Sequence, residues 1–187
     1  MNPDPPRHEP PPAATITDAD AYARAIVAQY QAPLTRYATR LLAGDADRAR
    51  DIVQDTLLRL IGPPRADVGD HLAEWLFTVC RHRALDTLRK EGRMKRIDET
   101  QAARIAADAP RPGHALEAGE THAAMLRLIG ALPANEQEVI RLKFQNGFSY
   151  KEIARITEHS VNHVGVLLHN AIHRLRAGWE SSEALKA

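Results

Sequence analysis

Apolar residues recur at intervals of three and four along most of this chain, which is the spacing of one face of an α-helix. The pattern covers residues 21–42, 47–61, 76–90, 117–131, 139–144 and 161–175, and it stops at Leu132 and Pro133. No segment shows the strict two-residue alternation, flanked by hairpin turns, that is typical of strands. The sequence therefore predicts an all-α protein.

Proline and glycine interrupt the helical pattern and divide the chain. Residues 1–12 contain six prolines, and so polar a stretch does not fold alone, so we expect a disordered tail over residues 1–16. Thr17 or Asp18 caps the first helix, a second helical stripe begins at Pro33, and Gly44 ends it. A Gly-Pro-Pro break at residues 62–64 precedes the helix at 76–90. The predicted first domain spans residues 17–92.

A change of composition marks a second unit. Residues 93–116 are rich in charge, alanine, proline and glycine, which is typical of a flexible linker. The predicted second domain spans residues 117–180, and residues 181–187 form a short tail. We therefore expect two small helical domains joined by a flexible linker.

Charge and cysteine content narrow the function classes. The 187 residues carry 25 Lys and Arg against 24 Asp and Glu, a net charge of +1, so any nucleic-acid surface must come from local clustering. The single cysteine, Cys80, excludes an internal disulfide and a multi-cysteine zinc site, and its apolar neighbours predict a buried thiol. We expect a cytoplasmic protein without membrane contact, because the sequence has neither a signal-peptide pattern nor an 18-residue apolar stretch.

The helix at residues 76–90 has two different sides. The apolar side consists of Phe77, Cys80, Ala84 and Leu88, and the polar side of His82, Asp86, Arg89 and Arg93. Basic groups that recur along one helix face suit a phosphate backbone, because each of them displaces condensed counterions. A charged face that is merely solvated is the alternative reading.

Residues 149–176 carry the most specific local signal. Ser149 and Glu152 match the S-x-x-E capping box, and Ser160 can cap a further helix. The apolar stripe of that helix is Val161, Val164, Leu168, Ala171 and Leu175. Two short helices joined by a tight turn predict a helix-turn-helix, whose second helix would offer Asn162, His163, Val166 and Asn170 to a DNA major groove. An ordinary helical hairpin within a bundle remains the alternative.

Three segments carry a family resemblance. "LPANEQEVIRLKFQNGFSYKEIARITEHSVNHVGVLLHNAIHRLR" at residues 132–176 resembles the carboxy-terminal domain of bacterial RNA polymerase sigma factors of the extracytoplasmic-function group in the sigma-70 family. "ARDIVQDTLLRL" at residues 49–60 is similar to the polymerase-binding helix of that group, and "EWLFTVCRHRALDTLRK" at residues 74–90 to its promoter-melting helix. The likeness spans about residues 22–176. It implies a two-domain protein that binds core RNA polymerase, recognises the minus-10 and minus-35 promoter elements and assists DNA melting.

The resemblance also implies roles for individual residues. The residues that it implies for contact with the clamp helices of the largest polymerase subunit are Asp51, Gln54, Asp55 and Leu58. The minus-10 set is Arg65, Trp75, Arg81, His82, Asp86, Arg89, Lys90 and Arg93. The minus-35 set is Lys151, Arg155, Ser160, Asn162, His163, Val166, Asn170 and Arg174. The plainer readings are a solvated acidic edge for Asp51 and Asp55, and a place in the core for Trp75.

The second helix of the predicted motif departs from the family pattern. Gly165, Leu167, Asn170 and Ile172 stand where lysine or arginine is usual, so phosphate contacts must come from Arg141, Lys143, Lys151, Arg155, Arg174 or Arg176. We therefore expect a shallow salt dependence of DNA binding. His163, His169 and His173 lack a carboxylate partner for a metal ion, and His163 and His169 are not an i, i+4 pair. A pH-tuned DNA affinity through these histidines is a hypothesis.

The sequence contains no recognisable catalytic motif. It has neither a phosphate-binding Gly-Lys-Ser/Thr loop nor a nucleophile elbow, so we expect no enzyme activity, no cofactor and no metal. The expected partners are core RNA polymerase, promoter DNA and an anti-sigma protein. Two alternatives stay open: a stand-alone helix-turn-helix regulator, and a sigma mimic that sequesters an anti-sigma protein without touching DNA.

Overall fold

A computed structural model of the chain describes residues 19–61, 69–90 and 116–184. Within these ranges all regular structure is helical, as the sequence predicts. The elements are α1 (Ala19–Leu41), α2 (Ala46–Ile61), the 3-10 turn η1 (Gly69–His71), α3 (Leu72–Lys90), α4 (Leu116–Gly130), α5 (Ala134–Phe144), α6 (Tyr150–Thr157) and α7 (Val161–Ala184). The predicted amino-terminal tail and nearly all of the predicted linker lie outside the described residues, as do the Thr17 and Asp18 caps.

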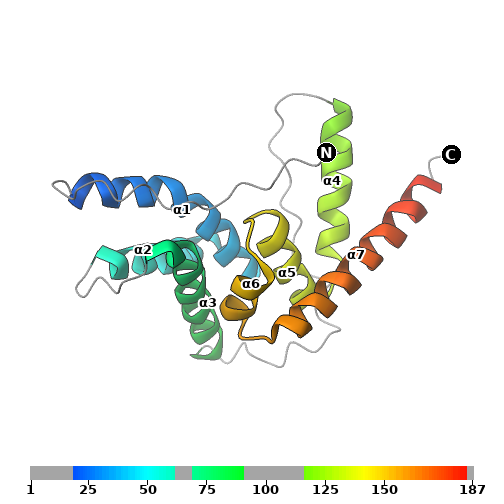
Figure 1. Cartoon of the computed structure of the whole chain (residues 1–187). Helices are drawn as coiled ribbons and strands as arrows, with labels where there is room; N and C mark the ends of the chain where they lie inside the picture. The colour runs from blue at the N-terminus through cyan, green and yellow to red at the C-terminus, as the bar shows by residue number, and fades with distance from the viewer. Residues whose placement is uncertain (1–18, 62–68, 91–115, 185–187) are drawn as a thin grey trace.

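Helices α1, α2 and α3 form the first half of the molecule (Figure 1). The two apolar stripes predicted before Gly44 belong to one continuous helix, because Pro33 lies inside α1 without ending it. A proline inside a helix costs roughly 3 kcal/mol. Burial of Tyr30 and Leu34 on either side of the proline offsets this cost, since both side chains are fully enclosed in the core.

The turn between α1 and α2 is formed at Gly44, where the sequence predicts the end of the helix. Gly44 has φ +94°, a conformation that glycine adopts without a steric penalty, and its amide donates to the carbonyl of Thr39 at 2.8 Å. The Asp45 carboxylate then accepts from the Arg48 amide at 3.1 Å and caps α2. These caps fix where α1 ends and α2 begins.

Helices α4 to α7 form the second half. The buried amide of Gln137 in α5 donates to the carbonyls of Gly130 and Leu132, which ties α5 to the turn that follows α4. Helices α4 and α7 diverge from their contact near the centre of the molecule (Figure 1). Helix α7 continues through Ala184, past residue 180, where the sequence pattern placed the end of the domain.

The predicted apolar faces are largely confirmed. On α3, Phe77, Cys80 and Ala84 are fully buried, and Leu88 packs against the core. On α7, the predicted stripe is wrong at its first member, because Val161 is 43% exposed. Val161 is the first residue of α7, so it lies beside the turn, and the buried side of the helix starts one turn later.

The two halves pack directly on each other, which the sequence did not predict. Helix α6 of the second half lies against α3 of the first half (Figure 1). At the centre of this contact the rings of Phe77 and Phe148 meet edge to face, with their centroids 5.0 Å apart. Both rings are buried, so one apolar core runs through both halves. None of the described helices combines the length and apolar character that crossing a bilayer requires.

Candidate functional site

The outer face of α2 presents acidic, amide and apolar groups together. Asp51, Gln54 and Leu58 are exposed, and their spacing of three, four and seven residues places them on one side of the helix. The Leu58 side chain is 56% exposed. Asp55 lies on the same side, and its carboxylate accepts a hydrogen bond from Arg83 of α3. An exposed leucine among carboxylates suits a protein partner with basic and apolar groups.

The polar side of α3 divides into an exposed part and a covered part. The Asp86 and Arg89 side chains are each 60% exposed, and a guanidinium nitrogen of Arg89 lies 3.3 Å from a carboxylate oxygen of Asp86. This ion pair is weak because water surrounds it, so a phosphate can replace the carboxylate. Lys90 is exposed, while Trp75 packs against the core and keeps part of its ring exposed. Two further members of the predicted minus-10 set, Arg65 and Arg93, lie outside the described residues.

Arg81 is the covered member of the predicted minus-10 set. Its side chain is only 12% exposed, and its Nε donates to Glu138 of α5 at 3.0 Å. The same carboxylate oxygen accepts from the Tyr37 hydroxyl at 2.6 Å. Glu138 therefore joins α1, α3 and α5, and the three side chains are called the Glu138 node below.

Two members of the Glu138 node, Tyr37 and Arg81, have raised pKa values. Burial, followed by the neighbouring Glu138 charge, raises the pKa of Tyr37 well above its usual value, so the phenol stays protonated and keeps donating. Burial lowers the pKa of Arg81, but the Glu138 carboxylate outweighs this effect and the net pKa is raised. The Arg81 guanidinium therefore stays charged and the Tyr37 hydroxyl stays neutral over the physiological pH range.

Helices α6 and α7 form the helix-turn-helix geometry that the sequence predicts. The Ser149 amide donates to the Glu152 carboxylate at 2.7 Å, and the Glu152 amide donates to the Ser149 hydroxyl at 3.3 Å, so both bonds of the capping box are present. Glu158 ends α6 with φ 60°. The Ser160 hydroxyl then accepts from the His163 amide at 3.1 Å and caps α7.

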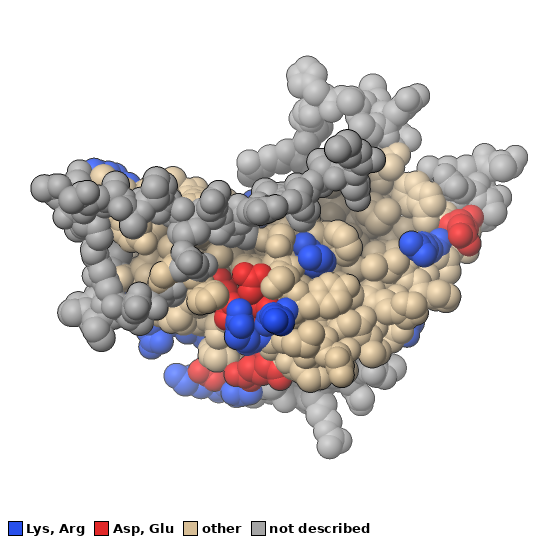
Figure 2. All heavy atoms as spheres, in the orientation of Figure 1, with Lys and Arg blue, Asp and Glu red and all other residues tan. Residues whose placement is uncertain are grey.

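The outward side of α7 carries few charges. The predicted groove-facing residues are all exposed, and they are Asn162, His163, Val166 and Asn170. On the face shown in Figure 2, Lys and Arg form small separate groups, several of them beside Asp or Glu, and the described residues form no continuous basic surface. The four exposed residues of α7 suit apolar and amide contacts to base edges better than a dense set of phosphate contacts.

Several of the cations expected to hold phosphates are already paired or buried. Arg155 makes a forked pair with Glu74 of α3, with two nitrogen–oxygen distances of 2.6 Å. Arg174 lies 3.3 Å from Glu136. Arg141 was a wrong candidate, because it is 6% exposed and lies in the core of the second half. Lys151 remains exposed at the start of α6.

Two histidines meet at the turn between α6 and α7. The rings of His159 and His163 are perpendicular, with centroids 4.8 Å apart. Burial, and then the nearby His163 and Arg81, lower the pKa of His159. At the exposed edge of the contact between the two halves, Nε2 of His82 in α3 lies 2.8 Å from the carboxylate of Glu158, the residue that ends α6.

Cys80 has the surroundings of a structural thiol. It is fully buried, as predicted, and burial raises its pKa to about 12. A thiol that is not ionised near neutral pH is a poor nucleophile and a poor metal ligand. In the described part of the chain, His, Cys, Asp and Glu form no group of three that could hold a metal ion.

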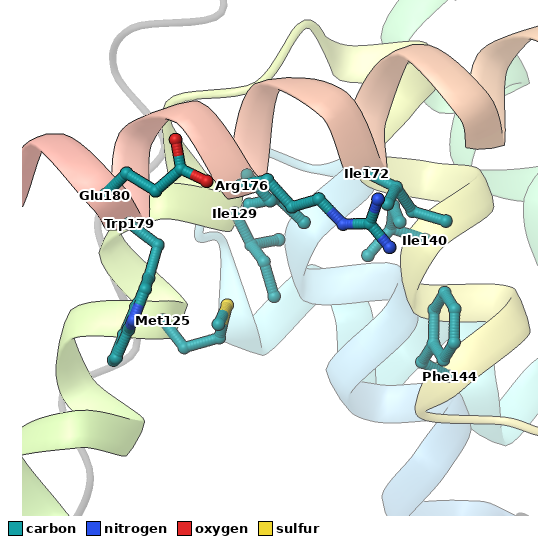
Figure 3. A pocket seen from close by; sticks show the side chains of 9 residues that line it. Met125, Ile129, Ile140, Phe144, Ile172, Arg176, Trp179 and Glu180 are labelled. Carbon is teal, nitrogen blue, oxygen red and sulfur yellow. The ribbon is translucent and has the colours of Figure 1, made fainter.

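An apolar groove lies on the second half, between α4, α5 and α7 (Figure 3). Its volume is about 440 Å³. Met125, Phe144 and Trp179 contribute to its wall, and only Arg176 and Glu180 bring charge to its rim. Phe144 is 58% exposed, so apolar side chains of another molecule can reach it. The sequence pattern placed these residues on helices but did not bring them together.

The interface residues that the sequence analysis missed are Glu74, Glu138 and Glu158. Their partners are 81, 57 and 76 residues away in the chain. Helical periodicity reports only which residues share a face of one helix. No local signal could have found these three carboxylates.

Two protein-family models match the chain, one in each helical half. The family described as Sigma-70 region 2 matches residues 26–94, and the family described as Sigma-70, region 4 matches residues 122–175. The first match covers most of α1, α2 and α3, and the second covers most of α4, α5, α6 and most of α7. Both matched regions therefore coincide with the two helical halves.

Single relatives match this chain over most of its length. The chain is 33% identical over 138 residues to the ECF RNA polymerase sigma factor EcfG of Rhodopseudomonas palustris, covering 73% of this chain and 74% of that protein. It is 32% identical over 163 residues to the ECF RNA polymerase sigma factor SigL of Mycobacterium tuberculosis, covering 83% and 88%. A solved structure, the sigma factor RpoE in complex with the anti-sigma factor NepR from Bartonella quintana, superposes with a TM-score of 0.62 at 25% identity and covers 84% of this chain and 96% of that one.

Proposed function

The chain belongs to the extracytoplasmic-function group of RNA polymerase sigma factors, and we propose that it performs its sigma role through three surfaces, on α2, on α3 and on α6–α7. As a sigma factor it directs transcription initiation by RNA polymerase at promoters. The chain supplies specificity to the polymerase, and the chemistry of RNA synthesis is that of the polymerase. The observation that carries this function is the presence of both sigma regions, in order, on one chain.

The proposed polymerase contact is the outer face of α2. Asp51, Gln54 and Leu58 are exposed side by side, and the Asp55 carboxylate beside them is oriented by Arg83. Leu58 is 56% exposed, and covering its apolar side chain with a partner would stabilise the complex. The surrounding carboxylates fit a basic helical partner, here the clamp helices of the largest polymerase subunit.

The proposed minus-10 contact is the polar side of α3 together with the loop that precedes it. Arg89 and Lys90 are exposed at the end of the helix, where they can follow the backbone of a single strand. His82 and Arg81 lie further toward the second half, and Asp86 lies beside Arg89. Trp75 keeps part of its ring exposed, although its main contribution is packing.

The proposed minus-35 contact is made by α7 with support from α6. Asn162, His163, Val166 and Asn170 enter the major groove, with Ser160 at the helix start. Asparagine reads adenine through two hydrogen bonds, and Val166 suits a thymine methyl group. Lys151, Arg155 and Arg174 supply the phosphate contacts, two of them after release from their carboxylate partners.

An anti-sigma protein is a further proposed partner. The support is the likeness to RpoE, whose solved structure is a complex with the anti-sigma factor NepR. Because polymerase and chromosomal DNA are the other partners, the proposed place of action is the cytoplasm.

Binding to purified core polymerase tests the proposed α2 surface. Changing Asp51 and Gln54 together to alanine should weaken core binding at least about tenfold, equivalent to about 1.4 kcal/mol. The readout is fluorescence anisotropy of the labelled chain at low salt. The matched control is Gln31→Ala with Asp86→Ala, which changes the same residue types on other faces and should keep the affinity. Equal affinity of wild type and the α2 variant would show that polymerase docks elsewhere.

The same titration distinguishes the proposed sigma function from two alternatives. A stand-alone helix-turn-helix regulator, or a mimic that only captures anti-sigma proteins, has no need for core polymerase. Either alternative predicts no core binding by the wild-type chain.

A further inference from the structure

Three arginines converge on one small cavity between α1 and α5. Arg36 and Arg40 lie one turn apart on α1, and Arg141 comes from α5 of the second half. The carboxy-terminal turns of α1 run up to α5 in Figure 1, and Tyr37 of α1 is hydrogen-bonded to Glu138 of α5 there. The cavity has a volume of about 20 Å³, and its other lining residues are Pro33, Tyr37, Gln145 and Asn146. None of the described residues that line it is an aspartate or a glutamate.

The three arginines line the cavity at different depths. Arg141 is 6% exposed, whereas Arg40 is half-buried and Arg36 is exposed. Little water surrounds Arg141, so its charge acts on a neighbouring anion more strongly than a surface charge does. Arg36 is open to solvent at the mouth. The cavity therefore offers an anion both an inner and an outer cation.

The Glu138 carboxylate is joined to one wall of the cavity but is already balanced. It accepts a hydrogen bond from Tyr37, which lines the cavity, and another from Arg81, which does not. The charge of Arg81 compensates that of Glu138 in this nearly buried pair. The charge among the residues that line the cavity is therefore positive.

The size of the cavity selects the kind of anion. A volume of about 20 Å³ admits one oxygen-sized group, because a single water needs roughly 10–15 Å³ of such space. A terminal phosphate can place one oxygen inside and leave the others at the mouth. Guanidinium groups match phosphate oxygens through paired N–H donors. A phosphodiester of DNA carries a sugar on each side, which keeps it from entering so narrow a recess.

From this convergence we propose that the cavity between α1 and α5 is a binding site for the terminal phosphate of a small phosphorylated compound. Arg141 and Arg40 hold the inner oxygen, and Arg36 pairs with the oxygens at the mouth. The site goes beyond the proposed function, because none of the three arginines belongs to the surfaces proposed for polymerase or promoter DNA. A ligand held from both α1 and α5 stabilises the folded chain by mass action.

Titration of the full chain with pyrophosphate tests the site, because this probe has terminal phosphates and neither a base nor a sugar. Calorimetry should give a single site per chain. Pyrophosphate at about ten times its Kd should raise the melting temperature by about 3–6 °C. In the Arg36→Gln/Arg40→Gln variant the affinity should fall at least about tenfold, and the rise in melting temperature at the same concentration should be lost.

The matched control is Arg24→Gln/Arg59→Gln. It removes two exposed positive charges from α1 and α2, away from the cavity, and should keep the Kd for pyrophosphate within about twofold of wild type. If the cavity variant does not fold, as judged by circular dichroism, Arg36→Gln alone is measured in the same way. Arg36 is exposed, so this single change leaves the core intact, and it should weaken binding about threefold.

A second titration, with labelled single-stranded DNA that lacks a terminal phosphate, distinguishes a small phosphorylated compound from the DNA backbone. The cavity variant and its control should bind this DNA equally. The proposal would be overturned if folded wild type failed to bind pyrophosphate, or if the cavity variant bound it as tightly as the control. Loss of DNA affinity in the cavity variant, without pyrophosphate binding by wild type, would assign the arginines to the DNA backbone instead. Neither titration contains polymerase, so run-off transcription still decides the proposed function separately.

Discussion

At the scale of single residues, buried charge is what gives the contact between the halves its specificity. Phe77 and Phe148 alone would tolerate many orientations, whereas Glu138 accepts from both Tyr37 and Arg81 and so fixes one arrangement. Removing one partner of a buried charged pair costs about 3–5 kcal/mol, because the other charge is left without compensation. The Glu138 node is therefore a specific contact as well as a stabilising one.

His159 gives the stability of this region a dependence on pH. Its pKa in the folded protein is lowered by burial first, and then by His163 and Arg81, while Glu138 acts in the opposite direction. The unfolded chain therefore binds more protons than the folded chain once the pH falls below about 6.5, and stability is lost as the pH falls further. Stability at pH 7.5 is unaffected, since His159 is neutral in both states there.

The measurement is the melting temperature of wild type and of His159→Gln between pH 7.5 and pH 5.5. The wild type should lose melting temperature more steeply on acidification, because the glutamine has no proton to gain. His169→Gln, at an exposed position of α7, should follow the wild-type curve. Parallel curves for wild type and His159→Gln would mean that this histidine does not control the acid response.

At the scale of elements, the helix-turn-helix depends on two caps. The Ser149–Glu152 box begins α6, and the Ser160 hydroxyl begins α7. Both caps satisfy amides that the first turn of a helix leaves without partners. They fix where α6 and α7 begin, on either side of the turn that joins the two helices.

Ser149→Ala should lower the free energy of unfolding by about 1 kcal/mol, because one cap bond is lost from the box. The corresponding fall in melting temperature is about 2–4 °C for a chain of this size. Ser181→Ala is the matched control, since the Ser181 hydroxyl is exposed and only bonds back to the carbonyl of Ala177 within α7. A melting temperature equal to that of this control would remove the capping box as a source of stability.

The scarcity of cations on α7 predicts how DNA binding responds to salt. Asn170 is exposed on the face proposed for the major groove, where a lysine would reach a phosphate. Asn170→Lys should steepen the slope of log K against log salt by about 0.9, the value for one added phosphate contact. Mobility-shift titrations of holoenzyme on promoter DNA over a salt series give this slope, and an unchanged slope would place residue 170 away from the DNA backbone.

Local signals account for most of the elements and for part of the site. The capping box, Ser160 and Gly44 act within a few residues of themselves, so their sequence predicts their structure. Pro33 stays inside α1 because burial outweighs its local cost, and periodicity gives no measure of that balance. The exposed faces of α2 and α7 are predicted for the same reason as the elements, since exposure follows from the apolar stripe on the opposite side.

At the scale of the whole molecule, the important feature is that two halves, each matching a different sigma-70 region, pack on each other. Sequence resemblance predicts both halves but not their contact, because Glu74, Glu138 and Phe148 each have a local explanation as a helix or turn residue. Their partners come from the other half and are found only when the chain is folded. The same residues therefore stabilise the packed arrangement of the two halves.

Run-off transcription tests the central claim most directly. Purified core polymerase is incubated with this chain and fragmented genomic DNA from the organism that encodes it, and the 5′ ends of the transcripts are sequenced. The account predicts transcripts that require the chain and that share one sequence element near minus 10 and another near minus 35. A folded chain that binds core polymerase but yields no chain-dependent 5′ ends would contradict it.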